Sequence, residues 1–238
     1  MLELKQISFF KSAVESISSF VPEGNFHFTD KGIFFKAIDP SQVVLVDYFV
    51  DKKYFDKYAM EPNFVGVDLV ELNKILQRAL SDDKMVLDVS DSEIKVRFEG
   101  EMKRNFRLPL IDVSGEEPKS PAIEYESKIE INASLMKEIL KDASLFSSSI
   151  VLKVSDGKFF IEAKGSSGVM ESETTKVSSV LSKKEITVKY SLNFFQNIVR
   201  QADNDKPIII ELKNDAAMRV TYSIGPSKIV FYLAHMIL

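Results

Sequence analysis

The 238-residue sequence has no cysteine and no tryptophan, and only two histidines. Without cysteine it cannot form disulfides or thiolate metal sites, and the cytoplasm is the expected compartment. His27 and His235 lie in opposite halves, so they cannot form a zinc-binding histidine cluster within one domain. Neither stands in a motif typical of a catalytic triad, and the glycine-rich residues 165–168 lack the Lys-Ser/Thr of a phosphate loop. We therefore expect no cofactor, no metal and no enzymatic activity.

Long apolar runs are also missing. No run approaches the roughly 20 residues that a membrane-spanning helix needs. With 45% hydrophobic and 28% charged residues, the composition is typical of soluble globular proteins. The net charge of -4 argues weakly against a nucleic-acid ligand. Any such role must therefore depend on where the positive charges lie.

One interval, residues 111–123, shows neither helical nor strand periodicity. It contains Pro118 and Pro121, which each remove a backbone donor and favour an extended chain. It also lies near the middle of the sequence. We predict a linker at 111–123 that joins a first domain, residues 1–110, to a second, residues 124–238.

The two halves repeat one pattern at an offset of about 122 to 126 residues, which is the kind of internal repeat that defines a fold. Each half reads as a strand, a helix, several strands, a second helix and further strands. Apolar residues recur with helical spacing over 9–20, 68–80, 134–146 and 190–203. Short connections between strands favour antiparallel sheets with the helices on one side. The sequence therefore predicts an α+β protein of two tandem similar domains.

Several segments resemble the sliding-clamp family of the proliferating cell nuclear antigen type, with most similarity to archaeal members. They match in order and spacing over the whole chain: TDKGIFFKAIDPSQVVLVDYFV, GVDLVELNKIL, LPLIDVSGEEPKSPAIEY, YSLNFF and FYLAHMIL. The resemblance implies a homotrimeric ring with sheets outside and helices inside, around double-stranded DNA bound without regard to sequence. It implies tethering of a replicative polymerase, a clamp loader, a flap endonuclease and a DNA ligase in replication and repair. The expected location is the nucleoid, or the nucleus in a eukaryote.

Carried onto this sequence, the resemblance implies three sets of residues. The DNA-facing cations are Lys11, Lys74, Arg78, Lys137, Lys141, Lys189 and Arg200. The subunit interface joins strands 101–108 and 168–175, through Lys103, Arg104 and Arg107 on one side and Glu171 and Glu173 on the other. A basic edge that faces an acidic edge is complementary between copies of one chain. The partner-peptide pocket is formed by Ile38, Val43, Pro121, Ile123, Tyr232 and Ala234.

The sequence departs from the family pattern near this pocket. Ser120 stands where an aliphatic residue is usual, and His235 and Met236 stand where a proline and a basic residue are common. These departures indicate an altered partner preference or a subunit of a heterotrimeric clamp. A separate alternative is a duplicated α+β adaptor that binds protein peptides and does not encircle DNA.

Overall fold

The computed structural model describes residues 1–174, 178–180 and 185–237. These residues form two compact units. Unit 1 comprises Met1–Pro40, Val46–Pro118 and Ile224–Ile229, and unit 2 comprises Ser41–Leu45, Lys119–Ser223 and Val230–Leu238. The described helices are α1 (Ile7–Ser18), α2 (Leu69–Leu76), α3 (Ala133–Ser144) and α4 (Leu192–Val199), with a short 3-10 helix η1 (Lys52–Tyr54). No helix in this part of the chain is long and apolar enough to cross a membrane.

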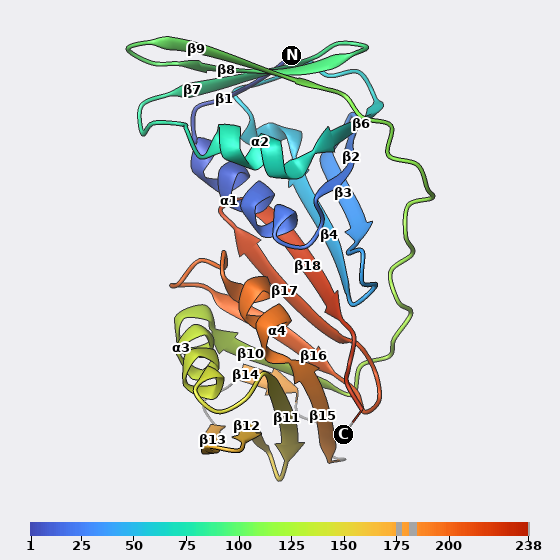
Figure 1. Ribbon diagram of the computed structural model, residues 1–238, viewed down its shortest axis with the longest axis vertical. Helices are drawn as coiled ribbons and strands as arrows, with labels where there is room; N and C mark the ends of the chain where they lie inside the picture. The colour runs from blue at the N-terminus through green and yellow to red at the C-terminus, as the bar shows by residue number, and fades with distance from the viewer. Residues whose placement is uncertain (175–177, 181–184, 238) are drawn as a thin grey trace. The chain divides into compact units, whose positions relative to one another are not determined.

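Unit 1 carries α1 and α2 side by side (Figure 1). A five-stranded sheet has the order β5-β1-β7-β8-β9, and four further strands run in the order β4-β3-β2-β6. The first sheet consists of β5 (Lys57–Tyr58), β1 (Leu2–Leu4), β7 (Lys84–Val89), β8 (Glu93–Glu99) and β9 (Lys103–Pro109). The other strands are β4 (Val44–Asp51), β3 (Gly32–Ile38), β2 (Glu23–Phe28) and β6 (Asn63–Asp68).

Unit 2 repeats this arrangement with α3 and α4. A four-stranded sheet has the order β13-β12-β11-β15, and further strands run in the order β14-β10-β16-β17-β18. The first sheet consists of β13 (Gly168–Thr174), β12 (Lys158–Gly165), β11 (Ser149–Ser155) and β15 (Ile186–Ser191). The other strands are β14 (Ser178–Val180), β10 (Ser127–Asn132), β16 (Pro207–Leu212), β17 (Met218–Ile224) and β18 (Ser227–Leu233).

Alternation along the strands places one face of each sheet in the core. On β8, for example, Ile94, Val96 and Phe98 are buried, whereas the residues between them are partly exposed. The helices bury their apolar stripes, such as Phe10, Ala13 and Ile17 of α1. Strand pairs such as β7–β8 and β11–β12 are antiparallel. The predicted α+β fold, with two helices in each half, is confirmed.

Capping residues explain where two of the helices begin. The carboxylate of Asp68 accepts the backbone N–H of Glu71 at 2.9 Å, and Asn132 Oδ1 accepts the N–H of Ser134 at 2.9 Å. Aspartate and asparagine are among the residue types that favour this position. The first helix, α1, begins at Ile7 after Gln6, which makes no side-chain capping bond within the described residues.

Candidate functional site

The helix pair of unit 1 carries three of the predicted DNA-facing cations. Lys11 is half-buried on α1, whereas Lys74 and Arg78 are exposed on and just after α2. The ammonium of Lys74 lies 2.6 Å from a carboxylate oxygen of Glu71, one helical turn away. This hydrogen bond raises the pKa of Lys74, which remains positively charged at neutral pH. The surface thus offers separated cations that are partly neutralised by local acids.

The helix pair of unit 2 also carries cations that are bonded to neighbouring side chains. Lys141 pairs with Glu138 at 2.6 Å, and Arg200 donates to the side-chain oxygen of Asn197. Between the two helices lies an open cavity of about 240 Å³. It is lined by Lys137, Leu140, Lys141, Gln196, Val199 and Arg200.

Lys137 differs from the other helix cations. Its ammonium donates to the carbonyl of Ala202 at 2.6 Å and to Asn204 Oδ1 at 2.8 Å, so it fastens α3 to the loop after α4. Partial burial lowers its pKa. Because two of its three N–H donors are already used, Lys137 has less capacity for a phosphate than its sequence position suggested.

Lys189 lies on strand β15 rather than on a helix. It alternates with the buried residues Val188 and Tyr190, so its side chain is on the face opposite the core. Because α4 contacts β15 and helices cover the buried face, Lys189 points away from the helix side. We therefore leave it out of the DNA-facing set.

The two predicted interface strands are both edges of their sheets, since β9 and β13 end their strand orders. On β9, Lys103 and Arg107 are exposed on one face. On β13, Glu171 and Glu173 are exposed on one face. An edge strand presents unpaired backbone donors and acceptors that can pair with another chain. The last residue of the predicted segment 168–175 lies outside the described residues.

Arg104 differs from the other two cations that were predicted at the interface. It is half-buried and alternates with Lys103, so it points to the other face of β9. There it pairs with the buried carboxylate of Asp83, and its Nη1 donates to the carbonyl of Arg78 at 2.8 Å. Asp83 also accepts the N–H of Leu80 at 2.6 Å. Arg104 therefore holds the end of α2 against β9 instead of facing outward.

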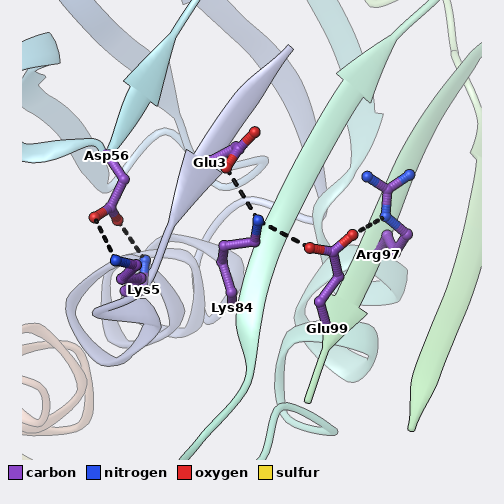
Figure 2. A network of polar contacts seen from close by, with 6 residues as sticks. All are labelled: Glu3, Lys5, Asp56, Lys84, Arg97 and Glu99. Atoms are coloured by element: carbon purple, nitrogen blue, oxygen red, sulfur yellow. Dashed lines mark hydrogen bonds and ion pairs between the residues drawn. The ribbon is translucent and has the colours of Figure 1, made fainter. Parts of the chain in front are cut away.

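A network of polar contacts spans β1, β7 and β8 on the same sheet (Figure 2). The ammonium of Lys84 lies 3.1 Å from Glu3 and 2.8 Å from Glu99, and Glu99 also accepts from Arg97 at 2.9 Å. The hydrogen bond from Lys84 holds the pKa of Glu99 below its usual value. Glu99 faces Lys103 in the register of β8 and β9, so the charges alternate in sign up to the sheet edge.

A groove runs along the first half of the linker within unit 1. Its volume is about 380 Å³, and linker residues 113–118 form one wall. The opposite wall includes Ile38 and the aromatic rings of His27, Phe34 and Phe64. His27 stacks on Phe64 with 4.1 Å between ring centroids, and more than half of Phe64 is exposed. Of the predicted pocket residues, Ile38 lines this groove, and the aromatic wall was not foreseen.

The other predicted pocket residues belong to unit 2. The N–H of Ala234 donates to the carbonyl of Val43 at 2.9 Å, which fixes these two residues together. Pro121 is exposed and Ile123 half-exposed. Tyr232 is buried, and its side chain hydrogen-bonds to Arg219.

Arg219 joins two segments that the sequence did not connect. Its guanidinium lies 4.8 Å from the ring centroid of Tyr125 and donates to Glu211 at 2.6 Å. The hydrogen bond to Glu211 raises the pKa of Arg219. One arginine thus fixes Tyr125, just after the linker, and Tyr232, near the C-terminal end.

Comparison with known proteins agrees with this geometry. The family model for the N-terminal domain of proliferating cell nuclear antigen matches residues 1–115. A DNA polymerase sliding clamp of Methanococcus maripaludis is 31% identical over 94% of this chain and 94% of the relative. DNA polymerase sliding clamp 1 of Thermococcus kodakarensis is 30% identical over 94% of this chain and 93% of its own. The chain belongs to the DNA sliding-clamp family of the proliferating cell nuclear antigen type.

Solved structures support the same assignment. The crystal structure of the antigen from Thermococcus kodakaraensis superposes on this clamp with a TM-score of 0.92 and 26% identity, over 99% of both chains. A complex of PCNA2 and PCNA3 from Sulfolobus tokodaii matches the fold with a TM-score of 0.87, 22% identity and 98% coverage of both chains. This clamp is thus a processivity factor for DNA polymerase and not an enzyme.

Proposed function

We propose that three copies of this clamp close into a homotrimeric ring around double-stranded DNA. The division into domain 1 (residues 1–110), linker (111–123) and domain 2 (124–238) belongs to this proposal. The observation that carries it is the pair of sheet-edge strands with opposite exposed charge, β9 and β13, on one chain. Head-to-tail pairing of two different edges generates a closed ring when the rotation between subunits closes.

The DNA-facing set in this proposal is Lys11, Lys74, Arg78, Lys141 and Arg200. Ion pairs such as Lys74–Glu71 and Lys141–Glu138 moderate the attraction of these cations for phosphates. A topological link does not need tight binding, and phosphate contacts are blind to base sequence. A weakly cationic helix surface is therefore suited to a ring that holds DNA and still slides.

Apolar side chains next to the edges support the same subunit contact. Leu80, just after α2, is 65% exposed, and Leu145, at the end of α3, is 71% exposed. Each follows a helix that packs near one of the two edge strands. Both leucines therefore lie where the proposed subunit contact would cover them.

We also propose that partner proteins bind through short peptides. The groove along linker residues 113–118 offers apolar and aromatic walls, and an extended linker can pair with an added strand. The polymerase, the clamp loader, the flap endonuclease and the ligase are the proposed partners, and the nucleoid is the proposed location. Pocket residues Val43, Pro121, Ile123, Tyr232 and Ala234 stay part of this prediction.

Retention on circular DNA tests the ring. Clamp loaded on a nicked circular plasmid should stay bound through gel filtration at moderate salt, because a closed ring cannot leave a closed circle. Cutting the plasmid once should release it. Equal retention on circular and linear DNA would show ordinary binding and contradict the topological link.

A further inference from the structure

The two charged residues exposed on β13 are not equivalent. The carboxylate of Glu173 lies 3.2 Å from the ammonium of Lys158 in its own subunit. Glu171 stands directly opposite Glu162 of β12. Like charges directly opposite each other on neighbouring strands destabilise a sheet. Glu171 and Glu162 thus form a like-charge pair at the edge of this sheet.

Both carboxylates lie on the face of the sheet away from the core. Glu162 alternates with buried Ile161 and Ala163, and Glu171 is exposed. Within the described residues neither forms an ion pair. The ammonium of Lys153 interacts electrostatically with Glu162, but it is bonded to Glu185 at 3.0 Å. The pair therefore keeps a net negative charge within one subunit.

The other edge of the chain offers the matching charge. Lys103 and Arg107 are exposed on the face of β9 away from buried Phe98 and half-buried Arg104. Arg107 stands opposite Lys95, so these two residues form a pair of positive charges. Lys103 stands opposite Glu99. Lys95 is bonded to Glu93 at 2.9 Å, and Arg107 contributes to the lowered pKa of that glutamate. When β9 and β13 extend one sheet, the exposed faces of both lie on its outer side.

Resting on the ring proposed above, we propose that Glu162, one strand inside the edge, belongs to the subunit seam. Glu162 and Glu171 together receive an exposed cation, Lys103 or Arg107, from β9 of a second copy. Adjacent strands are about 4.8 Å apart, so Glu171 lies one spacing and Glu162 two spacings, about 9.6 Å, from the added strand, and an extended Lys or Arg side chain spans that distance toward both carboxylates. The two carboxylates repel each other within one subunit and attract the cation of the second copy across the seam. Pairing of β13 with β9 is therefore favoured over pairing of two β13 edges or two β9 edges.

The test is the subunit dissociation constant by sedimentation equilibrium, for the full-length clamp and for Glu162→Gln and Glu171→Gln. Each variant should weaken the seam about fivefold or more, in the range of a close charge pair. Glu173→Gln lies on the same seam and is the comparison variant: because its carboxylate already pairs with Lys158, we expect a smaller loss than for Glu162→Gln or Glu171→Gln. Glu61→Gln controls for net charge at an exposed site outside β13. Thermal unfolding of the dissociated Glu162→Gln chain should be no easier than that of the parent.

Combining Glu162→Gln with Lys103→Gln and with Arg107→Gln identifies the cation. The effects of one of these pairs should be less than additive, because the second substitution removes a contact that is already lost. Additive effects for both pairs, or losses no larger than with Glu173→Gln, would overturn the role of Glu162 and leave the ring in place. A parent chain that shows no association would overturn the ring itself.

Discussion

At the scale of single residues, the ion pair between Asp83 and Arg104 was not predicted from the sequence. Arg104 reads as one of three cations on an edge strand, and all three were assigned to the interface. Side chains alternate between the two faces of a strand, so Arg104 lies on the face opposite Lys103 and Arg107. This difference could have been predicted from the sequence. Its partner Asp83 was not readable, since the contact joins a turn to a strand 21 residues later. The same holds for the contact of Arg219 with Tyr125, which lies in a distant segment, whereas Glu211 is on the neighbouring strand β16.

Replacing Asp83 by alanine should destabilise the clamp by about 2–3 kcal/mol, because Arg104 and the N–H of Leu80 lose a buried acceptor. Asp82→Ala is the matched control, since that neighbouring carboxylate is exposed. Urea unfolding followed by circular dichroism measures both. Equal stability of the two variants would show that the Asp83 contacts add nothing.

At the scale of elements, the four helices were readable because apolar residues recur with a period near 3.6. The first residue of a helix can be predicted only where a capping side chain precedes it, as at Asp68 and Asn132. Between β4 and β6 the chain forms the 3-10 helix η1 at residues 52–54 and the two-residue strand β5. Charge and hydrophobicity do not distinguish a short turn from a strand there.

The two helices of unit 2 offer a comparison of caps. Asn132 Oδ1 caps α3 through the N–H of Ser134, whereas within the described residues the Ser191 side chain makes no such bond at the start of α4. Asn132→Ala should therefore cost about 1 kcal/mol of unfolding free energy, and Ser191→Ala close to none. Chemical unfolding of both variants checks this. A larger loss for Ser191→Ala would contradict the assigned caps.

At the scale of the whole molecule, the duplication predicted from the repeat is visible as two units that each carry two helices and antiparallel strands. Whereas the linker at 111–123 stays a prediction, the edge strands β9 and β13 were predictable, because strand alternation and charge are local properties of the sequence. The groove with His27, Phe34 and Phe64 was not, since its walls come from strands and a linker that only the fold brings together.

The central claim is that one kind of chain closes its own ring by pairing two different charged edges. Light scattering over a range of protein concentrations tests it most directly. We predict a mass of three times the 26.9 kDa of one chain, which falls toward the single-chain mass at low concentration or high salt. A mass of one or two chains at every concentration would contradict self-assembly and indicate a clamp that needs a different partner subunit.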